Sequence, residues 1–182
     1  MQEKNNKFII AYIIIGILGR LIPHPANVTP LNSLCLFAGS KLSRLMAIIT
    51  MLLCILISDL GLAYLKGYPL FGSWTFFTYS GFALIVLLGA GLGKKFSNLK
   101  LVMYVVGSSL GFWLWTNLGS WLMTPYYIKD MQGLITCYTA ALPFLRNALF
   151  GDLVWMVVIF GLYRIRIPFK MFLVANWSNK NG

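Results

Sequence analysis

The sequence is poor in acidic residues, histidine and cysteine, which many soluble folds and metal sites need. Its 182 residues include four aspartates and glutamates together, one histidine and three cysteines. Cys35, Cys54 and Cys137 lie far apart, and two of them fall inside apolar runs, so we expect no disulfide framework. His24 has no second histidine or carboxylate pair near it in the sequence, so we expect no metal site and no cofactor.

Sequence patterns of catalysis are missing as well. The chain has no nucleophile elbow, no His-Glu-x-x-His motif and no phosphate-binding loop. Ser58 and Asp59 are adjacent, but together with a distant histidine they do not form a triad by sequence. We therefore expect that the protein is not an enzyme, and that it cannot drive uphill transport by itself with ATP.

Apolar residues dominate what is present. The chain is 59% hydrophobic and only 10% charged, whereas soluble domains are about 25% charged. Its mean hydropathy is +0.77. A bilayer core of about 30 Å needs roughly 20 apolar residues per helix, so a chain of this length has room for five or six spans. We predict an all-α membrane protein, with one transmembrane domain over residues 1–173 and a polar tail over 174–182.

The apolar runs predict a six-transmembrane-helix bundle in the lipid bilayer. Its spans are expected at about residues 8–22, 25–40, 45–65, 75–92, 101–123 and 143–163. Residues 124–143 are expected to form a loop with a short surface helix. In the second span, Thr29 and Pro30 resemble an N-cap followed by proline at the first helical position. The stretch from 30 to 40 is only about 16 Å long as a helix.

The second span therefore leaves three alternatives open. It starts earlier, near Pro25, or it is a half-helix entered through an irregular segment. A re-entrant hairpin that leaves five spans is the third alternative, but it would put Lys41 and Arg44 on the wrong side.

Basic residues predict the orientation. The net charge of +11 comes in short clusters between apolar runs, which is typical of cytoplasmic loops and does not indicate nucleic-acid binding. With six spans, only Lys66 and Lys129 fall in the loops of the opposite side. The other side receives Lys4, Lys7, Lys41, Arg44, Lys94, Lys95, Lys100, Arg164, Arg166 and Lys170. We expect a multi-pass protein of the bacterial inner membrane with both termini in the cytoplasm.

Ionisable residues inside the spans are expected to have a structural or functional role, because each costs at least about 2.5–3.5 kcal/mol to insert. Arg20, Asp59, Arg146 and Asp152 all map to the outer half or the middle of the membrane. Two acids and two bases at one depth can pair and tie helices together, which is the structural interpretation. The functional interpretation is a polar pocket for a small solute. Its candidate substrate-binding residues are Arg20, His24, Asn27, Thr29, Asp59, Asn117, Trp121, Tyr138, Arg146, Asn147 and Asp152.

Glycines inside the predicted spans are expected to mark close helix packing. The candidates are Gly16, Gly19, Gly89, Gly91, Gly93, Gly107 and Gly111. Gly107 and Gly111 have the four-residue spacing of a packing motif, a common signal of low specificity.

Several short strings resemble an uncharacterised family of small bacterial membrane proteins. They are R-L-I-P-H-P at 20–25, N-V-T-P at 27–30, S-D at 58–59, T-N at 116–117 with Trp121, and C-Y at 137–138 with the stretch from 141 to 152. The resemblance covers about residues 8–163. More loosely, that family resembles the S components of energy-coupling-factor (ECF) transporters, six-helix proteins that capture vitamins or metal ions on the outer face.

The looser resemblance implies an ECF S-component-like fold with a solute site near the outer face. It also implies an energising ATPase and coupling module as a partner. The Ala-x-x-x-Ala motif that contacts this module in S components is missing, because Ala11 is followed four positions later by Ile15. A solitary uptake protein is therefore an equal alternative.

These observations favour a membrane-embedded protein that binds or takes up a small water-soluble, vitamin-like compound from the periplasmic side. Arg20, Arg146, Asn147 and His24 are expected to contact an anionic or polar group, and the two aspartates to orient the arginines. The alternatives are an assembly or scaffold protein whose charges are structural, and an intramembrane enzyme.

Overall fold

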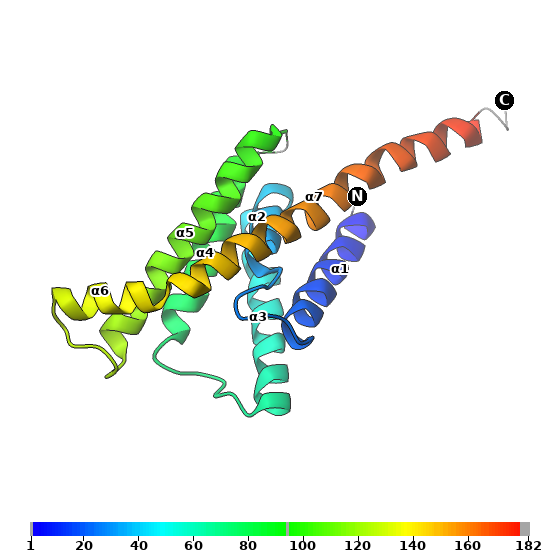
Figure 1. Ribbon diagram of the computed structural model, residues 1–182. Coiled ribbons are helices and arrows are strands. Elements are labelled where there is room, and N and C mark those ends of the chain that lie inside the picture. Colours follow the sequence, from blue (N-terminus) through cyan, green and yellow to red (C-terminus); the bar gives the residue numbers. More distant parts are fainter. Residues whose placement is uncertain (1, 94, 179–182) are drawn as a thin grey trace.

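The computed structural model describes residues 2–93 and 95–178, and the side chains of residues 9–93 and 95–164. All regular structure in these residues is helical (Figure 1). The helices are α1 (Gln2–Leu21), α2 (Leu31–Lys41), α3 (Arg44–Lys66), α4 (Thr75–Leu92), α5 (Asn98–Met123), α6 (Met131–Ala140) and α7 (Leu142–Ser178).

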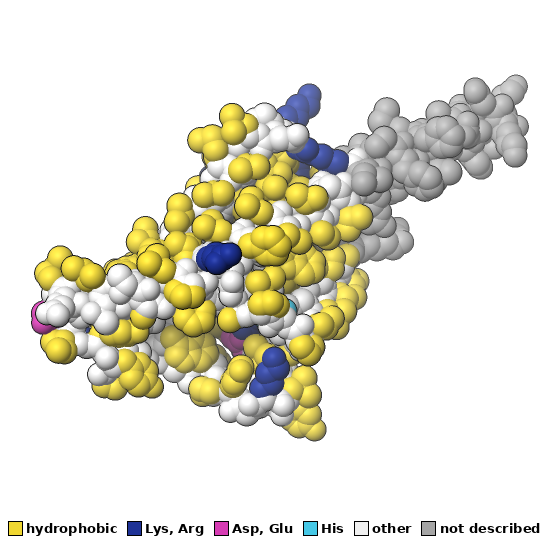
Figure 2. Space-filling view, in the orientation of Figure 1, with side chains coloured by type: hydrophobic (Ala, Val, Ile, Leu, Met, Phe, Trp, Pro, Cys, Tyr) yellow, Lys and Arg dark blue, Asp and Glu magenta, His cyan; other side chains and the backbone are white. Residues whose placement is uncertain are grey.

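Among the residues with described side chains, four helices are long and apolar enough to cross a membrane: α3, α4, α5 and the part of α7 from Leu142 to Arg164. The apolar part of α1, Ile9–Leu21, is shorter. Large hydrophobic side chains cover the outside of these helices, as the flank in Figure 2 shows. Leu45, Met103 and Phe150 are each more than 60% exposed. Such an apolar exterior fits lipid and not water, which agrees with the predicted class of protein.

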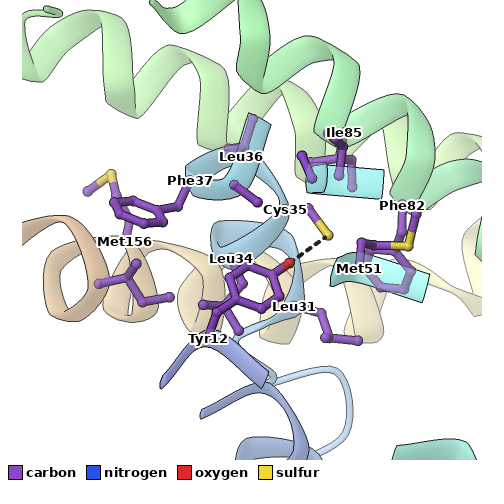
Figure 3. Close-up of a cluster of buried hydrophobic side chains, with 14 of the residues drawn as sticks. Tyr12, Leu31, Leu34, Cys35, Leu36, Phe37, Met51, Phe82, Ile85 and Met156 are labelled. Atoms are coloured by element: carbon purple, nitrogen blue, oxygen red, sulfur yellow. Dashed lines mark hydrogen bonds between the residues drawn. The ribbon is translucent and has the colours of Figure 1, made fainter. Parts of the chain in front are cut away.

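The short helix α2 lies at the centre of the bundle (Figure 1). Every residue from Leu31 to Ser40 is buried. Figure 3 shows its side chains surrounded by Tyr12 of α1, Met51 of α3, Ile85 of α4 and Met156 of α7. The Tyr12 hydroxyl donates to Cys35 Sγ at 3.8 Å. With 11 residues, α2 is about 16 Å long and reaches only halfway through a bilayer core.

An irregular segment of residues 22–30 leads into α2, so a helix that starts near Pro25 is not formed. The prolines prevent it, because each lacks an N–H and restricts the residue before it. Asn27 has a left-handed φ of 64°. Pro30 already has helical dihedral angles and occupies the N-cap position, so the predicted Thr29 cap is wrong by one residue. A Cβ on Gly19 would come within 2.5 Å of Pro30 Cγ, which shows how closely α1 packs on this segment.

Glycines bring the backbones of α2 and α4 into contact. A Cβ on Gly39 would lie 2.0 Å from the carbonyl oxygen of Val86, and one on Gly89 would lie 2.4 Å from that of Leu36. Gly16 is similarly close to Cys54. By contrast, a Cβ on Gly107 or Gly111 would meet nothing within 4 Å, so the packing role expected from their spacing is wrong.

The remaining helices lie close to the positions predicted from the sequence. The predicted short helix between residues 124 and 143 is α6, which Asp130 caps by accepting a hydrogen bond from the Gly133 N–H at 2.7 Å. Helix α7 continues to Ser178, so residues 174–178 of the predicted tail are helical. Residues 179–182 lie outside the described part of the chain.

Basic and aromatic side chains meet at the end of the bundle where α2 and α7 approach α5. Lys41 lies 5.0 Å from the ring centroid of Phe96 and 4.8 Å from that of Tyr163, and Arg164 also lies over Phe96. Lys100 donates to the last carbonyl groups of α4. The start of α1 and the end of α7 point toward this same end (Figure 1). Lys4, Lys7, Lys94, Arg166 and Lys170 fall outside the described side chains.

The close approach of α2 and α4 predicts that Gly39→Ala destabilises the protein by about 1–3 kcal/mol, because the added methyl group forces two backbones apart. Gly107→Ala is the matched control, since its methyl group enters open space. Thermal unfolding in detergent should give a lower Tm for Gly39→Ala and an unchanged or slightly higher Tm for Gly107→Ala. Equal Tm values would contradict the packing described here.

Candidate functional site

A cavity of about 350 Å³ opens beside the start of α2. The segment before α2, the start of α2 itself, and α1, α4, α5 and α7 all contribute to it. Its lining combines polar groups with aromatic rings: Arg20, Asn27, Thr29, Leu31, Asn32, Thr78, Phe82, Ser109, Phe112, Trp113, Thr116, Asn117, Ala141, Phe144, Ala148 and Asp152. The cavity exists because α2 is short and begins well inside the bundle.

Three polar side chains from three helices meet at the start of α2. Asn32 Nδ2 donates to Asp152 Oδ2 at 2.6 Å and to Ser109 Oγ at 3.0 Å. Ser109 Oγ lies 2.6 Å from the same carboxylate oxygen. Next to Asn32, the hydroxyl of Ser33 donates to the backbone carbonyl of Asp152 at 2.9 Å. These contacts fix α2, α5 and α7 to one another around a carboxylate.

This polar group is buried but its hydrogen bonding is incomplete. Asn32 is 6% exposed and Asp152 is 5% exposed. Asn32 Oδ1 is fully buried and has no hydrogen-bond partner among the described residues. Asp152 Oδ1 also makes no hydrogen bond within the described part of the chain, but it is not fully buried. A buried polar atom without a partner costs about 1–3 kcal/mol, so such atoms need an explanation.

Arg20 at the end of α1 is held by α3. Its Nη1 lies 2.6 Å from Asp59 Oδ1 and donates to Ser58 Oγ at 2.5 Å. Tyr79 of α4 donates its hydroxyl to the other Asp59 oxygen at 2.7 Å. Both charged side chains are mostly buried, at 17% and 8% exposed. Arg20 and Asp59 thus form an ion pair, as in the structural interpretation of these charges, and the pair joins α1, α3 and α4.

Five of the predicted site residues line the cavity: Arg20, Asn27, Thr29, Asn117 and Asp152. Asp59 lies behind Arg20 and lines a smaller neighbouring pocket with Tyr68, Pro69 and Trp74. Asn117 donates to the Trp113 carbonyl at 2.8 Å, one helical turn earlier in α5.

The other five predicted residues are not part of the cavity lining. His24 Nδ1 lies 2.8 Å from the carbonyl oxygen of Pro25 in the irregular segment. Trp121 donates to the Ile128 carbonyl at 2.9 Å and Tyr138 to the Leu114 carbonyl at 2.8 Å, which fixes α6 and its loop to α5. Arg146 is exposed, and Asn147 is half-buried.

The structural interpretation does not hold for Arg146 and Asp152, which do not pair because they lie on different faces of α7. Six residues at 3.6 per turn separate them by about 240° around the helix axis. Asp152 therefore faces α2 and α5, and Arg146 points outward. Ala148, four residues before Asp152, is on the same face and lines the cavity.

Sequence reasoning did not find Asn32, Ser109 or Thr78. Each is a neutral polar residue in an apolar run, and such residues are common in membrane helices. The one available signal was the position of Asn32, directly after the proline-rich segment. The aromatic lining of Phe82, Phe112 and Phe144 gave no signal either, because apolar side chains look alike in a span.

The Arg20 contacts predict that Arg20→Ala lowers the free energy of unfolding by about 3–5 kcal/mol, because Asp59 then stays buried without its cation. The double variant Arg20→Met, Asp59→Leu should recover most of this loss, since no buried charge remains. Unfolding in mixed detergent micelles measures both values. Arg146→Ala, which removes an exposed arginine, is the control and should change little. A harmless Arg20→Ala would show that the pair is not structural.

Comparison with known proteins shows the family of the chain but no characterised relative. No curated protein and no solved structure matches the chain significantly, so the likeness to ECF S components stays a prediction. A family model matches residues 2–171, almost the whole chain. Its description is "Family of unknown function (DUF6580)". The expected membership of an uncharacterised family is thereby confirmed, and the chain belongs to the DUF6580 family.

Proposed function

We propose that this protein captures a small water-soluble compound, of the size of a vitamin, from the periplasmic side of the bacterial inner membrane. The observation that carries the proposal is the cavity of about 350 Å³ with a buried polar group at the start of α2. Pockets for small molecules have volumes of about 300–1,000 Å³ and combine apolar walls with a few placed polar groups. This cavity has both properties.

Incomplete hydrogen bonding supports binding over a purely structural role. In Arg20 and Asp59, every charge has an opposite charge beside it, as expected of a tie between helices. Asp152 and Asn32 differ, because each keeps an oxygen without a partner among the described residues. A group that only stabilised the fold would gain from satisfying these atoms. A bound solute with a hydrogen-bond donor would satisfy Asp152 Oδ1, which is not fully buried and belongs to a residue of the cavity lining.

The proposal includes a six-span arrangement. Helices α1, α3, α4, α5 and α7 each make one passage, and the segment of residues 22–30 together with α2 makes the remaining one. Irregular backbone at membrane depth is tolerated where it lines a wet cavity, and broken helices of this kind form binding sites in transporters. The basic cluster around Lys41 and Arg164 then lies in the cytoplasm, and the cavity opens on the other side.

The proposed function predicts that purified full-length protein carries a small molecule that native mass spectrometry can detect. Ala148→Trp should abolish this bound mass, because the indole ring fills the cavity. Arg146→Ala, on another face of the same helix, should retain it. Both variants should remain folded in size-exclusion chromatography. If Ala148→Trp keeps the bound mass, the compound sits elsewhere and the proposal fails. No bound mass in the parent protein, before or after incubation with cell extract, favours the scaffold alternative.

The orientation predicts which positions a membrane-impermeant thiol reagent reaches in intact spheroplasts. Tyr126→Cys, in the loop between α5 and α6, should be labelled from outside. Lys95→Cys, between α4 and α5, should be labelled only after lysis. Background is low because the three native cysteines are buried, and burial raises the pKa of the Cys137 thiol and so reduces its reactive thiolate. Labelling of position 95 and not 126 in intact spheroplasts would reverse the orientation.

A further inference from the structure

The charges around the cavity do not balance. Arg20 and Asp152 both line it, which at first suggests neutrality. Arg20, however, is neutralised by Asp59 at 2.6 Å. No described cationic side chain pairs with Asp152, whose side-chain contacts are Asn32 and Ser109. Together these three charged residues leave one negative charge, and it is on Asp152.

Burial makes the ionised form of Asp152 costly, and hydrogen bonds offset part of this cost. Two polar side chains, the amide of Asn32 and the hydroxyl of Ser109, bind the same carboxylate oxygen, Oδ2. Hydrogen bonds to a carboxylate stabilise the charged state. Asn32 also belongs to the first turn of α2, where the partial positive charge of the helix end favours a nearby anion. The oxygen Oδ1 remains for a group from outside.

The walls of the cavity suit an organic cation. Phe82, Phe112, Trp113 and Phe144 contribute aromatic rings to its lining. Aromatic faces attract ammonium and related groups, most strongly when the cation is removed from water. A volume of about 350 Å³ also exceeds the space that a single inorganic ion occupies. The lining therefore suits a positive group attached to a larger molecule.

We propose that the captured compound carries a cationic nitrogen, such as a protonated amine, that pairs with the carboxylate of Asp152 while the aromatic rings hold the rest of the molecule. This inference rests on the proposed function and names its ligand class. It also replaces the anionic or polar group expected from the arginines with a positive one, because Asp59 neutralises the charge of Arg20 and Arg146 is not part of the cavity lining.

A cysteine in the cavity can report this charge preference without knowledge of the ligand. Ala148→Cys places a thiol one helical turn from Asp152 and replaces one small side chain with another. The reagents are two methanethiosulfonates of similar size, one with a trimethylammonium group and one with a sulfonate group. Tyr126→Cys is the reference, because position 126 is 82% exposed in the loop outside the cavity. The measured quantity is the ratio of cationic to anionic reaction rates, in which thiol reactivity cancels.

The ratio at position 148 should exceed the ratio at position 126 by about tenfold or more. A unit charge within a few ångströms changes the local concentration of a charged reagent by at least this factor, even at an effective dielectric constant of about 20. Asp152→Asn, which has nearly the same shape, should remove most of this excess. Asp152→Glu should keep it. The ratio at position 126 should be the same in all three backgrounds, which checks that the fold is unchanged.

Failure of this inference differs from failure of the proposed function. Equal ratios at the two positions, a preference for the sulfonate, or a preference that Asp152→Asn does not change would each overturn the cationic ligand while leaving capture intact. If position 126 reacts and position 148 reacts with neither reagent, the cavity is closed, and the capture proposal falls with the inference. An anionic compound found bound in the native mass spectrum would also overturn the choice of ligand charge.

Discussion

The central constraint in this structure is that α2 is too short to cross a bilayer. Its 11 residues reach about 16 Å, and the chain enters it through a proline-rich segment that cannot be helical. The helices around it are long, so the space in line with α2 is left to the irregular segment and the cavity. Backbone groups there need partners that lipid cannot supply, and polar side chains and a wet cavity can supply them. The cavity is therefore a consequence of the short length of α2 and the irregular segment before it.

Much of the fold could be predicted from the sequence, because apolar runs of membrane length have few alternatives. The predicted spans at 45–65 and 75–92 match α3 and α4 within one residue at each end. The start of α2 could not be fixed, since the segment of residues 22–30 permits a helix, a half-helix or a hairpin by composition. The packing role predicted for Gly107 and Gly111 was wrong for a related reason. Spacing identifies glycines on one face of a helix, but not whether another helix covers that face.

The charged residues of the site could be predicted from the sequence, and its neutral polar residues could not. Arg20, Asp59 and Asp152 are conspicuous because ionisable residues are costly in a span, and they form or line the polar sites. Asn32 and Ser109 are as important to the cavity, yet neutral polar residues in membrane helices can bond to their own backbone. Which of them face inward depends on how α2 and α5 are rotated. Arg146 is the opposite case. Its charge made it a candidate site residue, but it lies on a face of α7 that points away from Asp152 and is exposed.

The central position of α2 also constrains how the protein assembles. Helix α2 packs most extensively against α4 and also against α7, which are synthesised after it. When α2 leaves the ribosome, most of the surfaces that bury it do not yet exist, and an 11-residue segment is too short to be inserted as a span on its own. Its final docking must therefore follow the insertion of later helices. Helix α2 therefore reaches its final contacts only after helices that follow it in the chain.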